Sequence, residues 1–300
     1  MRIHLHVGVH KTATTLVQEV LGDHRDKLLA SKIGFLPMPS FREQFTRNLR
    51  DVSENESSFD DLIHKSFNGS PPQNPEGIVI SDENLIGYCG TIVKYGRPFL
   101  DGPRRLSLLR RMLGEHDVTL FMCIREYSAF LASAYCEGLR NEGRFIPFAD
   151  MKTIIDPDAF SWPTILASFV ESISPNRVCV WRFESFIKQP RAVLNEIAFH
   201  KSALFEGEDF NRVSRPSFSQ AAVDTLTLVR DNLGADIASR LLKPVVKNLP
   251  KADGFPAFNP WSEDEETFWN NKYLIDCKNI PDQYWFLPED NLKTSHERYP

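Results

Sequence analysis

The sequence predicts an α/β fold in which a central parallel sheet is flanked by helices. Short apolar runs alternate with longer segments whose apolar residues recur every three or four positions, as in helices that cover a sheet. The short runs are apolar throughout, which is typical of strands buried on both faces. Strand and helix follow each other along the chain, and this order indicates βα units with right-handed crossovers.

The apolar pattern places each element in turn. We expect strands at residues 3–8, 78–81, 118–124 and 178–181. We expect helices at residues 14–30, 103–114, 126–141, 162–174, 189–199, 217–247 and 262–277. Residues 66–77 are rich in Gly, Pro, Ser and Asn, which predicts a surface loop rather than a domain boundary.

We expect one domain over residues 1–300, in which residues 250–300 form a C-terminal cover rich in Pro and aromatic residues. Aromatic side chains of this kind line a pocket mouth or close a core, and the second role is the more common one. The residues concerned are Trp261, Trp269, Tyr273, Tyr284, Trp285 and Phe286.

Composition and charge exclude several classes of protein. The chain has 42% hydrophobic and 25% charged residues, as in ordinary globular proteins. Its net charge is −5 and its pI about 5.9, which disfavours a nucleic-acid partner that binds through a global basic field. No apolar run reaches the roughly 20 residues of a membrane span. A strand that begins at residue 2 leaves no room for a signal peptide, so we expect a cytoplasmic protein.

The five cysteines are odd in number and lack C-x-x-C spacing. We therefore expect buried free thiols rather than a metal or redox centre.

The loop after the first strand has the composition of a phosphate cradle. Ligands of open parallel sheets bind beyond the carboxyl ends of the strands, where this loop lies. Gly8 permits a tight turn, the following amides precede a helix N-terminus, and Lys11 adds a full positive charge. The candidate binding residues are Gly8, His10, Lys11, Thr12, Ala13, Thr14 and Thr15.

Two other interpretations of this loop remain open. The nucleotide-triphosphate loop G-x-x-x-x-G-K-[ST] requires glycine before the lysine, and His10 stands there, so an ATP-dependent kinase is the weaker reading. Alternatively, the threonines only cap the following helix and Lys11 is solvated.

The pattern Gly8-x-x-Lys11-Thr12-x-Thr14-Thr15 resembles the 5'-phosphosulfate loop of the sulfotransferases that use 3'-phosphoadenosine 5'-phosphosulfate (PAPS). The resemblance implies their P-loop NTPase-like fold. The family loop usually reads Lys-Thr-Gly-Thr-Thr, and Ala13 stands at the glycine position. This substitution implies either a turn with φ below zero at residue 13 or local strain.

A second anion site is expected after the third predicted strand. Arg125 follows that strand and Ser133 comes eight residues later, about two helical turns on and on the same side. In the family that these residues resemble, an Arg and a Ser at this spacing hold the 3'-phosphate of PAPS. The alternative is that Arg125 pairs with a carboxylate such as Glu126 and that Ser133 only packs. Residues 180–186 and 211–215 resemble further family segments less specifically and are interpreted as architecture. Arg215 could approach the nucleotide, but a solvated arginine is the more common state.

Glu83 is the candidate catalytic base, with Asp82 as the substitute. Both follow the second predicted strand, and transfer of a sulfuryl group requires removal of a proton from the nucleophile. Carbohydrate sulfotransferases commonly use a Glu in this region, whereas the cytosolic small-molecule branch uses a His. No His occurs between residues 78 and 114, so the chain resembles the carbohydrate and bacterial-type branch. Alternatively, Asp82 or Glu83 caps the next helix. His6 and His10 are expected to pack or to bond to the backbone.

The expected function is transfer of a sulfuryl group from PAPS to a hydroxyl or amine of a carbohydrate or small-molecule acceptor. Lys11 would stabilise the charge on the departing 5'-phosphate, and 3',5'-adenosine bisphosphate would be the product. The residues found require no metal. The alternatives are a P-loop ATP kinase and a non-catalytic nucleotide-binding module.

Overall fold

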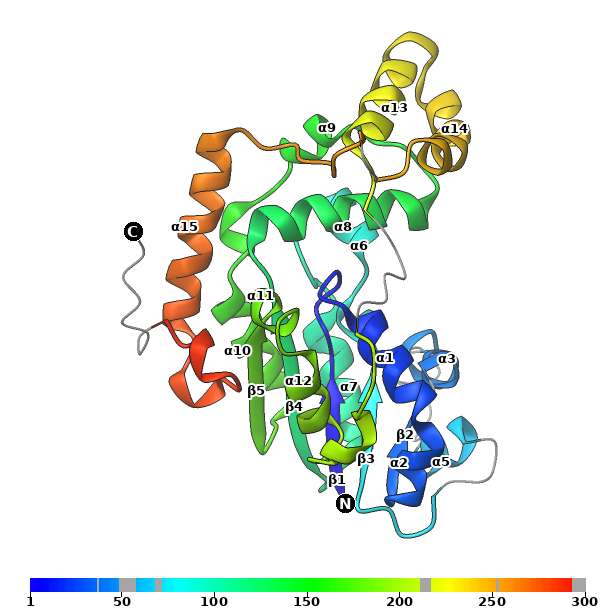
Figure 1. Ribbon diagram of the computed structural model, residues 1–300, viewed down its shortest axis with the longest axis vertical. Helices are drawn as coiled ribbons and strands as arrows, with labels where there is room; N and C mark the ends of the chain where they lie inside the picture. Colours follow the sequence, from blue (N-terminus) through cyan, green and yellow to red (C-terminus); the bar gives the residue numbers. More distant parts are fainter. Residues whose placement is uncertain (37, 49–57, 68–71, 211–216, 252–253, 293–300) are drawn as a thin grey trace.

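Five parallel strands form one sheet in the order β2-β3-β1-β4-β5 (Figure 1). The computed structural model describes residues 1–300 except 37, 49–57, 68–71, 211–216, 252–253 and 293–300. The strands are β1 (Arg2–His6), β2 (Ile33–Phe35), β3 (Gly77–Ser81), β4 (Asp117–Ile124) and β5 (Arg177–Arg182). The predicted class, an α/β fold with a central parallel sheet flanked by helices, is confirmed.

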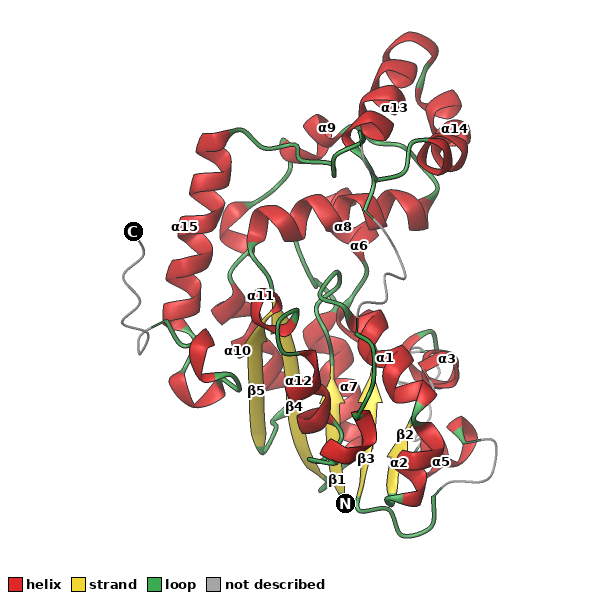
Figure 2. Ribbon diagram, viewed as in Figure 1, coloured by secondary structure: helices red, strands yellow, loops and turns green. Residues whose placement is uncertain are grey.

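Helices lie on both faces of the sheet and in a further layer beyond its carboxyl edge (Figure 2). The α-helices are α1 (Thr14–Asp23), α2 (Arg25–Ala30), α3 (Met38–Phe41), α5 (Phe59–Ser66), α6 (Cys89–Tyr95), α7 (Gly102–Leu113), α8 (Tyr127–Glu142), α9 (Phe148–Lys152), α10 (Trp162–Ile173), α11 (Phe183–Phe186), α12 (Pro190–Ile197), α13 (Gln220–Leu233), α14 (Ala235–Asn248) and α15 (Glu263–Asn279). Short 3-10 or π segments are η1 (Arg42–Thr46), η2 (Glu83–Ile86), η3 (Pro157–Ala159), η4 (Ser202–Phe205), η5 (Asp282–Tyr284) and η6 (Pro288–Asp290).

Two apolar cores sandwich the sheet. Along β3, Ile78 and Ile80 belong to one core and Val79 to the other, as the twofold repeat of a strand requires. The core on the Val79 side contains side chains of α1, α2 and α12, and the opposite core contains those of α7, α8 and α10. Burial on both faces explains why the strands are continuous apolar runs in the sequence.

The register of the central strands fixes where the loops leave the sheet. His6 at the end of β1 pairs with Ser81 at the end of β3 and with Phe121 in β4. The loop after β1 and the segment after β3 therefore leave at one level, between two neighbouring strands. β4 continues beyond Phe121 to Ile124, so Arg125, four residues after Phe121, stands further out from the sheet.

Some boundaries differ from the sequence predictions. β1 ends at His6 rather than residue 8, because the chain turns into the loop there. The expected helix 14–30 is two helices that meet at His24, which leaves the helical conformation with ψ 13°. The edge strand β2 was not predicted, because three residues centred on Gly34 are too short to show a pattern. The short helices α3, α5, α6, α9 and α11 were also missed. The helix expected from residue 217 to 247 is two helices, α13 and α14, because Gly234 has a φ of 91° and ends the first of them.

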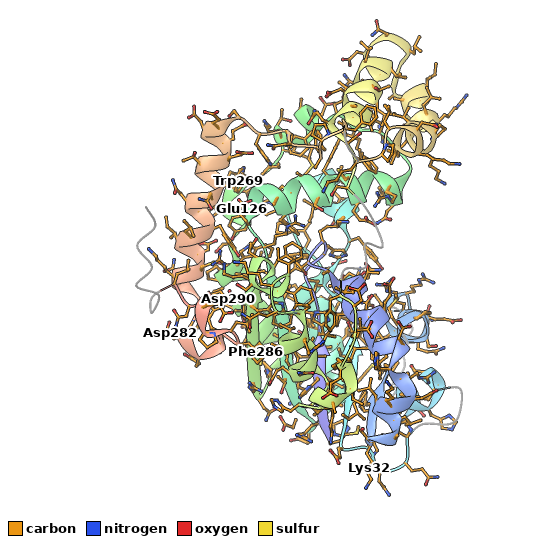
Figure 3. All side chains as sticks on the ribbon, in the orientation of Figure 1. Lys32, Glu126, Trp269, Asp282, Phe286 and Asp290 are labelled. Carbon is orange, nitrogen blue, oxygen red and sulfur yellow. The ribbon has the colours of Figure 1, made fainter. Side chains whose placement is uncertain are left out.

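The C-terminal part of the chain packs against the edge of the sheet. Trp269 and Tyr273 of α15 are buried in the core that also contains side chains of α7, α8 and α10. This is the core-closing role that the sequence predicts for them. Further on, Asp290 accepts hydrogen bonds from the Arg182 amide and the Ser185 hydroxyl (Figure 3). Helices α13 and α14 form a hairpin at the end of the molecule remote from β1 (Figure 1).

All five cysteines are buried free thiols, as the sequence predicts. In the part of the chain that the structure describes, no helix is long and apolar enough to cross a bilayer.

Candidate active site

The loop between β1 and α1 presents a row of backbone amides. Gly8, Lys11 and Ala13 all have left-handed φ angles, of 41°, 65° and 60°. The amides of Thr14 and Thr15 belong to the first turn of α1, where amides have no partner inside the helix. A tight loop that leads into such a helix N-terminus is an arrangement that suits an anionic ligand.

Gly8 is the residue that lets this loop close. A Cβ atom at position 8 would lie 2.2 Å from Cγ2 of Thr14, well inside van der Waals contact. The positive φ adds a second reason for glycine here.

The threonines do not cap α1. The N-cap residue is Ala13, which makes no side-chain hydrogen bond, and Thr12 donates its hydroxyl to the Val9 carbonyl at 2.5 Å. The alternative of a threonine-capped helix is therefore wrong. Of the two conformations left open for Ala13, the structure has the strained one with positive φ.

Ala13→Gly is expected to stabilise the protein. The left-handed conformation costs a non-glycine residue about 1–2 kcal/mol, and the greater freedom of glycine in the unfolded chain offsets about 0.4–1 kcal/mol of this. We expect a gain of about 0.5–1 kcal/mol, which is a rise in Tm of about 1–3 °C. Urea and thermal unfolding measure it, with Gly8→Ala as the destabilised control. A lower Tm for Ala13→Gly would contradict the strained loop.

Lys11 is paired rather than solvated. Its Nζ atom lies 3.4 Å from Oε2 of Glu137 on α8, and the two side chains are 16% and 7% exposed. Glu137 also accepts a hydrogen bond of 2.8 Å from Arg140. The interpretation of Lys11 as a free surface cation is thus wrong. Sequence reasoning missed Glu137, because nothing in the sequence of α8 indicates which of its faces meets the loop.

Arg125 joins the tip of β4 to the same loop. Its Nη1 atom donates to the Lys11 carbonyl oxygen at 2.6 Å, and its guanidinium stacks on the Phe183 ring at 4.6 Å. No carboxylate of the described residues lies within ion-pair distance of this guanidinium, whose pKa is lowered by burial. The nearby charge of Glu184 opposes this shift without a direct ion pair. A half-buried guanidinium that makes no direct ion pair is a favourable place for an anion.

Glu126 is not the partner of Arg125. Its carboxylate caps α8 by accepting hydrogen bonds from the amides of Ser128 and Ala129 (Figure 3 labels Glu126). The alternative of an Arg125–Glu126 pair is therefore wrong.

A cavity of about 310 Å³ brings Arg125 and Ser133 together. Lys251 and Asn259 line it from the C-terminal segment, and Trp261 closes one side. Trp261 thus has the pocket-lining role that the sequence left as the less common alternative. Lys251 and Asn259 were not identified as site residues from the sequence, because they are more than 100 residues away from Arg125 and lack a local motif. Arg215 and the rest of residues 211–216 lie outside the described residues.

The two carboxylates after β3 have different environments. Asp82 is fully buried, caps η2 through the Asn84 amide, and accepts hydrogen bonds of 2.7 Å from Arg42 and from Thr46. Glu83 is 16% exposed, and its two oxygens meet Gln18 at 2.7 Å and Arg42 at 3.0 Å. Asp82 is thus the capping residue, and Glu83 has the more accessible carboxylate.

Glu83 is ionised at neutral pH. Burial opposes ionisation, but interactions with His10 and with Arg42 and the hydrogen bond from Gln18 hold the pKa of Glu83 below its usual value. Each carboxylate oxygen still has a second lone-pair direction, so Glu83 can accept a further hydrogen bond.

The two histidines are packed, but they bond to side chains rather than to the backbone. His6 meets the Ser81 hydroxyl at 2.9 Å, and His10 meets the Asn84 amide oxygen at 3.2 Å. Burial lowers the pKa of His10, so its imidazole is neutral at pH 7. Lys11 is therefore the one full positive charge within residues 8–15. The His10–Asn84 contact also ties the loop to the segment that carries Glu83.

Asp82→Ala is expected to destabilise the fold. The substitution leaves the donors of Arg42 Nε and of the Thr46 hydroxyl without their acceptor, and each buried donor left unpaired costs about 1–3 kcal/mol. Glu83→Ala should cost clearly less, because Arg42 then keeps Asp82. Urea unfolding of both variants measures the difference, and equal losses would contradict the structural role assigned to Asp82.

The described residues contain no group of three or more His, Cys, Asp or Glu placed to hold a metal ion.

The sequence matches no protein-family model, and no curated protein is significantly similar to it. Among solved structures, the chain is similar to a sulfotransferase from Alicyclobacillus acidocaldarius, with 16% sequence identity and a TM-score of 0.41. The match covers 81% of this chain and 95% of that one. A similarity this weak does not assign a function to the chain.

Proposed function

We propose that this protein is a sulfotransferase that moves a sulfuryl group from PAPS to a hydroxyl or amine of an acceptor molecule. One observation supports the proposal most strongly: the loop that leads into the N-terminus of α1 and the half-buried Arg125 are hydrogen-bonded to each other. Two neighbouring anion sites fit a ligand that carries two separate phosphate groups. The motifs of both sites resemble those with which sulfotransferases bind the 5'-phosphosulfate and the 3'-phosphate.

Each residue has a chemical role in this proposal. The amides of residues 9–15 and the Lys11 ammonium would bind the 5'-phosphosulfate. Arg125 and Ser133 would bind the 3'-phosphate, with Lys251 as a further cation in the same cavity. Fixed donors at the 5' end stabilise the charge that develops there during transfer more than the charge of the ground state.

The transfer itself exchanges one bond to sulfur for another. The acceptor's oxygen or nitrogen bonds to sulfur while the bond from sulfur to the bridging oxygen of the 5'-phosphate breaks, and the electron pair of that bond stays on the phosphate. Lys11 would neutralise this charge. Glu83, ionised and partly accessible, would take the proton that the acceptor loses.

Ligand binding tests the two anion sites directly. We expect 3',5'-adenosine bisphosphate to bind in calorimetry and to raise the Tm, because a ligand of the native state stabilises it, whereas ATP with magnesium should bind more weakly. Arg125→Ala should weaken bisphosphate binding about 10–100-fold, as expected for loss of hydrogen bonds between charged groups. Lys11→Ala should lower turnover of PAPS about 100-fold or more, with a smaller effect on affinity.

Arg104→Ala is the control for a general loss of positive charge. Arg104 lies exposed on α7, and its contact with Asp101 is long, at 3.9 Å. Tighter binding of magnesium ATP than of the bisphosphate would favour a kinase. Equal bisphosphate affinities of Arg125→Ala and the wild type would exclude Arg125 from the site.

Glu83→Gln separates proton transfer from binding. The amide keeps the shape of the side chain but cannot accept the proton, so we expect sulfation of an accepted substrate to fall about 10²–10⁴-fold. Bisphosphate affinity should stay close to that of the wild type. Release of 3',5'-adenosine bisphosphate over an acceptor panel measures turnover, and an unchanged rate would remove Glu83 as the base.

A further inference from the structure

The cation that the proposed reaction needs at the 5' end is already bound to a carboxylate. Lys11 Nζ lies 3.4 Å from Oε2 of Glu137, and both side chains are largely buried. An anionic ligand that reaches Lys11 from the loop must therefore compete with Glu137. The length of the contact and the flexible stem of lysine make this pair easy to separate.

Glu137 keeps a second partner when Lys11 leaves. The same Oε2 atom accepts a hydrogen bond of 2.8 Å from Arg140, which lies three residues later on α8. This contact, at 2.8 Å, is shorter than the contact of 3.4 Å between Glu137 and Lys11. The Arg140 guanidinium also stacks on the Phe218 ring at 5.0 Å, which fixes it in place. Release of Lys11 therefore does not leave a buried charge without compensation.

The position of Glu137 on α8 links it to the other anion site. Glu137 comes four residues after Ser133, and side chains at this spacing lie on one face of a helix. One face of α8 thus offers a hydroxyl toward the cavity with Arg125 and a carboxylate toward Lys11.

We propose that Glu137 is a positioning residue that holds Lys11 until the phosphosulfate of the donor replaces the carboxylate, while Arg140 retains Glu137. This inference rests on the proposed function. Binding of the donor or of the bisphosphate breaks the Lys11–Glu137 pair, so the pair lowers the affinity for both. On product release, Lys11 returns to Glu137 and the departing nucleotide loses that contact.

The decisive variant is Glu137→Gln, because we expect it to raise the affinity for the ligand. A substitution that merely damaged the fold would lower this affinity. We expect calorimetry to show about 3–10-fold tighter binding of 3',5'-adenosine bisphosphate, as expected for loss of one competing ion pair. Glu142→Gln removes the same charge from an exposed position of α8 and should bind like the wild type. In the Lys11→Met background, Glu137→Gln should bring no gain, because no ammonium remains to be released.

Arg140→Gln gives an independent second measurement. Without Arg140, Glu137 holds Lys11 more firmly, so the bisphosphate should bind a few-fold more weakly, and adding Glu137→Gln should restore tight binding. If the wild type binds no bisphosphate, both the proposed function and the role of Glu137 fail. If the wild type binds it and folded Glu137→Gln binds equally or more weakly, the proposed function stands and the role of Glu137 is refuted.

Discussion

The hydrogen bond from Arg125 to the Lys11 carbonyl oxygen is the contact on which the site depends. It joins the tips of two adjacent strands, β1 and β4, and so fixes two positive groups relative to each other. A hydrogen bond with one charged partner contributes about 1.5–3 kcal/mol. This is comparable with the cost of about 1–2 kcal/mol for each left-handed residue, and the loop holds Lys11 and Ala13 in that conformation.

Charge is divided along the carboxyl edge of the sheet. The tips of β1 and β4 carry Lys11 and Arg125, while the tip of β3 carries Asp82 and Glu83, which Arg42 neutralises in part. The contact between His10 and Asn84 holds the two halves together. A chain of net charge −5 thus concentrates positive charge where a doubly anionic ligand would lie and keeps an ionised carboxylate beside it. Proton acceptance and anion binding are the two requirements of the proposed transfer.

The sequence predicted the parts of the molecule that local patterns determine. Strands buried on both faces appear as apolar runs, and the tight turn after β1 follows from Gly8, because its geometry is local. Glu137, Arg42 and Lys251 reach the site only through tertiary packing, and no spacing rule connects them to the loop. The conformation of Ala13 was left as two alternatives, because φ at a substituted glycine position depends on how firmly the neighbouring strands hold the turn.

A crystal structure with 3',5'-adenosine bisphosphate would show whether the two strand tips bind one ligand. We expect one nucleotide that spans both sites, with its 5'-phosphate on the amides of residues 9–15 and its 3'-phosphate between Arg125 and Ser133. A nucleotide bound elsewhere, or one that reaches the loop while its 3'-phosphate points away from Arg125, would contradict this expectation.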